Sequence, residues 1–416
     1  MLTVIYIVWN SFKMALQELR NNKLRTFLSL FGITIGIFCI IGVLATVESL
    51  QEKIQTDMKS LGTNTIYIDK WEYGNDDNEY PWWKYVKRPY PKFREMEAIK
   101  SRSELASAVC YSISGNTNLE FKDNVLSGIT CYGVTEDFNS VLTVNIQFGR
   151  YLTESEFTHA SPVILLGYTN AANLFVNPER GVGQNVKLKG KTLKVVGIIK
   201  KQGQSFVGGW QFDESIISPY KFVASMFNVE ESSPVLMVKG KESVASVALV
   251  DELRGIMRSI HTLSPREEDD FALNDINMLS EQMNKMFGSV NLGGWAIAGL
   301  SLLVGAFGVA NIMFVTVRER TSQIGLKKAI GAKSSTILTE FLLESAFLCL
   351  LGGFIGLVLV FILTKALSAV MPFPIHISAN TLTLAISICL IVGVLAGIIP
   401  ASIAAKMNPV VAIRTK

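Results

Sequence analysis

The chain has 416 residues, of which 49% are hydrophobic and 18% charged, and its formal net charge is +4. This mixture is too apolar for an ordinary soluble protein and too polar for a wholly membrane-embedded one, so it predicts membrane segments joined to a substantial water-exposed domain. The small net charge gives no support for nucleic-acid binding, and three scattered histidines argue against a metal site.

The N-terminal residues 1–26 precede the first long apolar run. Apolar side chains recur at helical spacing in residues 2–19 beside basic residues, which is typical of an amphipathic helix on the cytoplasmic membrane surface. A continuation of the first span into water is the alternative. Residues 27–47 carry no charge and are long enough to cross a bilayer. Because this run exceeds a signal-peptide core, we expect an uncleaved transmembrane anchor.

Residues 48–290 are expected to form an extracytoplasmic α+β domain. Strand–helix–strand patterns occur in about 48–114 and 226–290, which suggests the two halves of a ferredoxin-like module. The intervening stretch, about 115–225, predicts a β-rich insertion, with Lys189-Gly190-Lys191 as a hairpin turn. Apolar residues continue at helical spacing beyond the membrane at both ends of the domain, so two long helical stalks are expected.

Two further features of this domain allow more than one interpretation. Cys110 and Cys131 form a disulfide in an oxidising compartment or stay as separate thiols, and we favour separate thiols. The aromatic-rich loop from Trp71 to Tyr90 indicates either a partner contact or a lid packed on the domain or lying at the membrane surface. We favour the lid or the membrane-surface position.

The rest of the chain alternates apolar runs with short connections. They are a second span (291–317), a segment (318–336), a third span (337–367), a loop (368–381), a fourth span (382–405) and a tail (406–416). Lys and Arg gather before the first span, in 318–336 and in the tail, whereas 368–381 has none. The positive-inside rule therefore predicts that both termini and residues 318–336 are cytoplasmic.

Three of the four spans carry glycines four residues apart, at Gly32/Gly36, Gly352/Gly356 and Gly393/Gly397. Such pairs allow close helix packing, either between two protomers or within one four-helix unit, and the sequence does not separate the two. Near the start of the third span lie Glu340 and Glu344, one turn apart. We expect them to extend to the membrane surface or to pair with Lys333.

The segment from Asn311 to Ala332, NIMFVTVRERTSQIGLKKAIGA, closely resembles the signature of FtsX-like permeases of the MacB-type subgroup, in type VII ABC systems. The ending from Gly397 to Val410 and the entry from Leu19 to Thr26 are also similar to that family. Gly149–Leu152 and Val195–Gly197 resemble landmarks of its outer domain more weakly. The resemblance covers nearly the whole chain.

The resemblance implies a permease subunit that is no enzyme itself. MacB carries its own N-terminal ATPase domain and this sequence has none, so a separate ABC ATPase is expected to hold ATP and Mg²⁺, with no cofactor on this chain. The family uses the segment after the second span as a coupling helix in a cleft of the ATPase. The corresponding residues are Arg318, Glu319, Arg320, Ile324, Gly325, Lys327, Lys328 and Gly331. Charge-assisted contacts and an apolar face of Ile324, Leu326 and Ile330 fit that role.

The same resemblance implies mechanotransmission in a homodimer or related heterodimer, without a channel through the bilayer. Efflux of a drug, toxin or peptide, with a periplasmic adaptor and an outer-membrane duct, is the favoured output. Lipoprotein release and FtsX-like activation of a cell-wall hydrolase are the alternatives within the family. A membrane scaffold or sensor is the alternative outside it.

Overall fold

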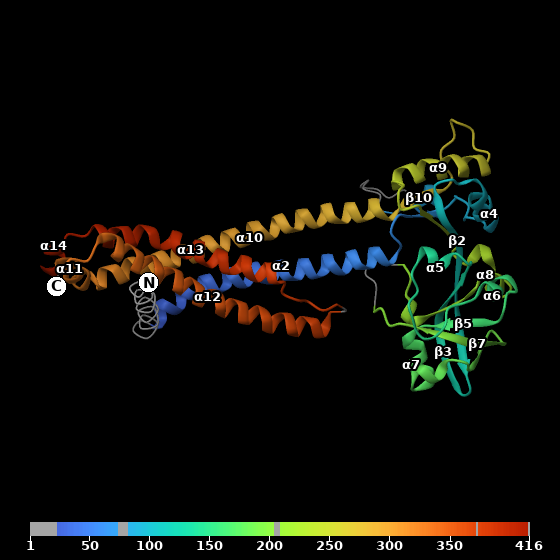
Figure 1. Ribbon diagram of the computed structural model, residues 1–416, viewed down its shortest axis with the longest axis horizontal. Coiled ribbons are helices and arrows are strands. Elements are labelled where there is room, and N and C mark those ends of the chain that lie inside the picture. The colour runs from blue at the N-terminus through green and yellow to red at the C-terminus, as the bar shows by residue number, and fades with distance from the viewer. Residues whose placement is uncertain (1–22, 74–81, 204–208, 372, 415–416) are drawn as a thin grey trace. The chain divides into compact units, whose positions relative to one another are not determined.

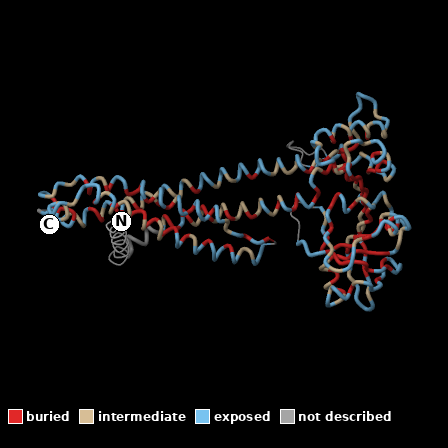
Figure 2. The backbone as a smooth tube through the Cα atoms, viewed as in Figure 1, coloured by how far each residue is buried: buried red, intermediate tan, exposed pale blue. Residues whose placement is uncertain are grey.

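The computed structural model describes residues 23–73, 82–203, 209–371 and 373–414 (Figure 1). The expected amphipathic helix of residues 2–19 lies outside the described residues. The chain forms two compact units, a membrane unit (Met1–Gln51 with Met286–Lys416) and an α+β unit (Glu52–Lys285). Each unit has its own buried core, visible as red segments of the tube in Figure 2.

The membrane unit is built on four helices that are long and apolar enough to cross a bilayer. They are α2 (Lys23–Ser60), α10 (Ile276–Glu319), α12 (Ser334–Val370) and α13 (Ala379–Lys406). Two short helices, α11 (Thr321–Ala329) and α14 (Pro409–Arg414), accompany them. The expected arrangement of one N-terminal and three C-terminal spans is thus confirmed. Helices α2 and α10 have 38 and 44 residues, well above the roughly 20 that a bilayer requires.

The spaced glycines bring the membrane helices together within one chain. A Cβ on Gly32 would lie 3.3 Å from Gly305 Cα, and one on Gly36 would lie 3.3 Å from Ser301 O, both on α10. The remaining glycines also face neighbouring helices: Gly352 O accepts a hydrogen bond from Thr34 Oγ1 (3.1 Å), Gly356 faces the backbone of Thr34, Gly393 faces Ala346, and Gly397 faces Ser345. Internal packing accounts for these contacts, and a dimer interface through the same residues stays a prediction.

The α+β unit is organised around one ten-stranded sheet. Its strands are β1 (Thr65–Asp69), β2 (Ala106–Phe121), β3 (Asn124–Val134), β4 (Ile146–Gly149), β5 (Val163–Leu166), β6 (Asn185–Leu188), β7 (Lys191–Ile199), β8 (Ser215–Pro219), β9 (Val235–Gly240) and β10 (Ala272–Asp275). The order is β10-β1-β9-β2-β3-β8-β5-β7-β4, and β6 pairs with β2 and β7. Short helices connect them: α3 (Trp82–Tyr85), α4 (Phe93–Arg102), α5 (Phe138–Val141), α6 (Glu154–Thr158), α7 (Tyr168–Phe175), α8 (Tyr220–Ala224), α9 (Ser246–Ile260), η1 (Pro178–Gly181), η2 (Phe212–Glu214) and η3 (Val229–Glu231).

The first four strands of this order, with α4 and α9, form the ferredoxin-like module that the sequence suggests. The predicted hairpin is also present, since Leu188 pairs with Lys191 and positive φ angles at Lys189 and Gly190 form its two-residue turn. Cys110 and Cys131 are buried, unpaired thiols, as expected. Burial raises the pKa of the Cys131 thiol to about 12, which makes it a poor nucleophile.

The β-rich insertion is continuous with the ferredoxin-like sheet because β2 is much longer than the expected strand. Residues 106–112 of β2 pair with β9, and residues 112–121 pair with β3. The sequence of the second half, with Ser114, Asn116 and Asn118, has the composition of a loop, and pairing with β3 and β6 keeps it extended. In the aromatic loop, Trp82 and Trp83 are 59% and 55% exposed, which argues against a packed lid at these two residues, and the membrane-surface position stays a prediction.

A histidine bridges two carboxylates beside the ferredoxin-like sheet and makes the stability of this unit depend on pH. Hydrogen bonds from the His261 ring to Glu95 (3.3 Å) and Asp270 (2.6 Å) raise the pKa of the imidazole. This stabilisation is complete below the unfolded-state pKa of about 6.5 and is lost as the pH rises through the higher folded-state pKa. We therefore expect amide hydrogen exchange in α9 to accelerate on raising the pH more in the wild type than in His261→Gln, after correction for the intrinsic rate. His159→Gln, at an exposed site, should behave like the wild type.

Candidate functional site

The segment between the second and third spans contains α11, a helix separated from its neighbours by two breaks. Arg320 lies at the first break, between the end of α10 at Glu319 and the start of α11 at Thr321. At the second break Gly331 has a φ of +100°, and the amides of Gly331 and Ala332 donate to the carbonyls of Lys328 and Lys327. This left-handed ending favours glycine and ends α11 at this point.

A buried ion pair fixes the first break. Arg320 Nη1 lies 3.1 Å from Glu344 Oε1 on α12, and the two side chains are 17% and 1% exposed. One turn earlier on α12, Glu340 Oε1 accepts a hydrogen bond from Lys327 Nζ at 2.7 Å. The expected pairing of these carboxylates with Lys333 is therefore wrong. Because α11 folds back along the start of α12, Arg320 and Lys327 pair with them instead.

The opposite contacts of α11 are with the C-terminal end of the chain. Lys328 Nζ donates to the carbonyls of Ala405 (2.6 Å) and Met407 (2.8 Å), where α13 ends and carbonyl groups lack helical partners. Gly325 packs on α14, since a Cβ there would lie 2.7 Å from Ala412 Cβ. Sequence reasoning missed α14, although Asn408-Pro409 is a helix-start signal and Asn408 Oδ1 accepts from the amide of Val410.

Five of the expected coupling residues (Arg320, Ile324, Gly325, Lys327 and Lys328) thus hold α11 against its own chain. Arg318, Glu319 and Gly331 are exposed. The expected apolar face needs correction: Ile324 is 3% exposed, whereas Leu326 and Ile330 are 59% and 80% exposed. At 100° per residue, Leu326 lies about 200° from Ile324 and only about 40° from Ile330, so only the last two share a face.

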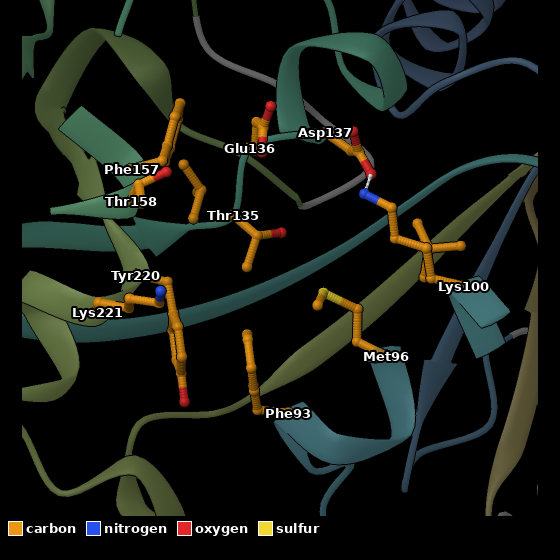
Figure 3. A pocket seen from close by; sticks show the side chains of 12 residues that line it. Phe93, Met96, Lys100, Thr135, Glu136, Asp137, Phe157, Thr158, Tyr220 and Lys221 are labelled. Carbon is orange, nitrogen blue, oxygen red and sulfur yellow. Dashed lines mark hydrogen bonds and ion pairs between the residues drawn. The ribbon is translucent and has the colours of Figure 1, made fainter. Parts of the chain in front are cut away.

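A second candidate site is a cavity of about 160 Å³ in the α+β unit (Figure 3). The rings of Phe93 and Tyr220 stack beside it, 4.8 Å apart, and its rim carries the ion pair of Lys100 with Asp137 at 2.7 Å. This pairing raises the pKa of Lys100. No sequence pattern indicates this cavity, because its walls come from α4, β2, the end of β3 with residues 135–137, α6 and α8. Its size suits one ring or side chain, and its lining residues include no cysteine or histidine.

Fold and site together define a class: a multi-pass membrane protein with an α+β unit between its first and second spans and an exposed short helix between its second and third. The family models give the particular family. The MacB-like periplasmic core domain matches residues 26–256, and the FtsX-like permease C-terminal domain matches residues 295–409. The chain therefore belongs to the MacB-like permeases of the FtsX-like family.

Individual relatives agree with this assignment. The chain is 30% identical over 410 residues to the macrolide export ATP-binding/permease protein MacB of Neisseria gonorrhoeae, with 96% of this chain and 60% of that protein covered. It is 29% identical over 425 residues to the uncharacterized ABC transporter permease YvrN of Bacillus subtilis, with 97% and 98% covered. The periplasmic region of MacB from Actinobacillus actinomycetemcomitans matches with a TM-score of 0.45 at 19% identity, over 56% of this chain and 98% of that one. The chain thus spans about 60% of the length of the MacB relatives.

Breaking the ion pair between Arg320 and Glu344 should destabilise the protein more than breaking the pair between Lys327 and Glu340. Arg320→Gln leaves a carboxylate that is 1% exposed without its cation, which we expect to lower the free energy of unfolding by about 3 kcal/mol. The double variant with Glu344→Gln should lose less than the sum of the single changes. Lys327→Gln is the matched control, with an expected loss below about 1 kcal/mol because Lys327 is 43% exposed. Denaturant titration of the purified full-length protein in mixed micelles measures the free energy of unfolding of the three single variants and the double variant. Additive losses for Arg320→Gln and Glu344→Gln would contradict an ion pair between the two residues.

Proposed function

We propose that this permease subunit couples ATP hydrolysis on a separate ABC ATPase to motion of its α+β unit. In this proposal both termini and α11 are cytoplasmic, the α+β unit is periplasmic, and the four spans lie in a bacterial inner membrane. The distribution of Lys and Arg over the connecting segments supports this orientation. ATP and Mg²⁺ bind the partner ATPase, and this chain contributes the surface on which that partner docks.

The observation that carries the proposal is the division of α11 into two faces. Its basic residues turn inward, to the carboxylates of α12 and the carbonyls at the end of α13. Its apolar residues Leu326 and Ile330 point away and are mostly exposed. An amphipathic helix normally buries its apolar face. Helix α11 buries Ile324 in this way but leaves two large apolar residues exposed, and a firmly held helix with such a surface is suited to insertion into an apolar cleft of another protein.

The length of α2 and α10 supports mechanotransmission. Both are uninterrupted helices that begin in one compact unit and end in the other. A helix resists bending unless Pro, Gly pairs or a bulge interrupts its hydrogen bonds. Helix α2 has neither Pro nor a Gly pair and is suited to carry displacement along its axis, whereas α10 contains the pair Gly293-Gly294, at which it can bend. In the proposal two protomers, identical or closely related, move together, and no channel through the bilayer is needed.

Export is the output that the relatives favour. The name of the Neisseria gonorrhoeae relative states macrolide export, and the proposal extends efflux of a drug, toxin or peptide to this chain. An adaptor and an outer-membrane duct would complete the path. The aromatic and charged lining of the 160 Å³ cavity gives the α+β unit a site for one side chain of such a partner or substrate.

Replacement of Ile330 by Asp tests the docking surface. Ile330 is 80% exposed and makes no large contribution to the core, so the variant should fold normally. A charge at the centre of an apolar contact should reduce recovery of the ATPase in co-purification at least ten-fold. Val247→Asp, a 66% exposed position on α9, is the matched control and should bind as the wild type does. Arg320 is unsuited to this test because its replacement also breaks the pair with Glu344. Equal recovery of the ATPase by Ile330→Asp would refute the docking surface.

A proline in α10 tests the transmission of motion. Val290 is 47% exposed in the middle of this helix. Val290→Pro removes a helical hydrogen bond and kinks the helix, at a cost of about 3 kcal/mol, whereas Val290→Ala preserves it. We expect Mg-ATP with vanadate to change amide hydrogen exchange in the α+β unit of the Val290→Ala complex but not of the Val290→Pro complex, while both retain the bound ATPase. A response that survives Val290→Pro would argue against transmission through α10.

A further inference from the structure

An apolar cleft of about 350 Å³ lies in the membrane unit between α2, α12 and α13. Its lining residues are Ile37 and Ile41 on α2; Phe347, Leu350, Leu351, Gly353, Phe354 and Leu357 on α12; and Leu382, Ala385, Ile386 and Cys389 on α13. Nearly every lining group is a hydrocarbon. Phe354 and Ile386 at its mouth are 65% and 46% exposed, so the cleft opens to the membrane around the unit.

The cleft has a structural cause. The start of α13 is tied to α2, because Glu48 accepts a hydrogen bond from Thr381 Oγ1 at 2.7 Å and Ser49 Oγ accepts one from the amide of His376 at 3.1 Å. Helix α12 packs on the same helices through Gly353 and Gly356 near its middle. The cleft lies at the level of these glycines, where residues 347–357 of α12 and residues 382–389 of α13 line the same space beside Ile37 and Ile41 of α2.

A single cation continues the exposed side of the cleft along α12. Lys365 follows Phe354 and Phe361 at intervals of eleven and four residues, so the three lie on one helical face. Lys365 Nζ lies 5.8 Å from the centroid of the Phe361 ring, and within the described residues no carboxylate forms an ion pair with it. The rise from Phe354 to Lys365 is about 16 Å, close to half of the roughly 30 Å hydrocarbon core. With Phe354 near the middle of the membrane, the Lys365 ammonium group therefore lies at the depth of the lipid phosphates.

We propose that this cleft binds one phospholipid, with an acyl chain between α2, α12 and α13 and the headgroup phosphate on Lys365. An apolar space that opens into a bilayer fills with hydrocarbon, because water has no hydrogen-bond partners there. A second protein copy fits less well, because docking there would remove Lys365 from water without supplying a carboxylate. The cation also selects net anionic headgroups over zwitterionic ones. With the orientation proposed above, the lipid belongs to the outer leaflet.

The test uses the full-length protein in nanodiscs, with a phosphatidylglycerol that carries a photoactivatable diazirine near the end of one acyl chain. After illumination, labelled peptides are identified by mass spectrometry, and phosphatidylcholine with the same chain serves as the zwitterionic probe. We expect labelling to concentrate in residues 347–357 and 382–389. The labelling yield in these residues should be about five-fold higher with the phosphatidylglycerol probe than with the phosphatidylcholine probe. Neither measurement involves the ATPase, so the labelling results do not depend on whether the docking surface proposed on α11 is correct.

Two pairs of variants complete the test. Ile386→Trp covers the cleft and should remove most of the labelling, whereas Ile391→Trp, at a 59% exposed position outside the lining, should not. Lys365→Gln should abolish the headgroup preference, and Lys365→Arg should retain it. Uniform labelling of all exposed apolar faces would overturn the proposal, as would labelling that Ile386→Trp leaves unchanged.

Discussion

A carboxylate buried among membrane helices is the constraint on which the α11 end of the molecule depends. Glu344 is 1% exposed, and a buried carboxylate is stable only beside a cation and hydrogen-bond donors. The chain supplies that cation from Arg320, which must reach α12 from the point where α10 ends. This requirement places the break between α10 and α11, and it directs the following helix back across the start of α12.

The remaining contacts of α11 follow from this placement. Once Arg320 is fixed, Lys327 and Lys328 fall on the inner side of the helix, where Glu340 and the carbonyls at the end of α13 satisfy them. Leu326 and Ile330 are then turned outward. A surface helix that serves only its own core would bury its large apolar residues, whereas here only Ile324 is buried and these two are exposed. Maintaining an exposed apolar face at this position costs solubility, which is the physical reason to assign a partner to it.

Much of the architecture follows from the sequence, because apolar runs, glycine spacing and strand–helix–strand patterns are local signals. The side to which each residue turns is set by contacts that are distant in the sequence. Nothing near Glu344 in the sequence designates Arg320, twenty-four residues earlier, as its partner. The second half of β2 has a polar composition, and it is a strand because β3 and β6 pair with it. The cavity beside Phe93 escaped prediction for the same reason, since its walls come from five separate elements.

Helix α12 shows how these constraints change along one membrane span. Its first turns are held by the ion pairs of Glu340 and Glu344, and its middle packs closely through Gly353 and Gly356. Its last turns, which carry Lys365, have neither kind of contact to α2. Val360 and Thr364 in these last turns are still buried, at 0% and 6% exposed, whereas Phe361 and Ile362 are 55% and 59% exposed, so only one face of this end is apolar and uncovered. In the proposed mechanism a displacement of α11 would act on α12 through Glu344, and because the helix is continuous from Ser334 to Val370, this uncovered face of its far end would move against lipid. A lipid held in the cleft would oppose closure of α12 onto α2, so the occupant of the cleft sets the resistance that this motion meets.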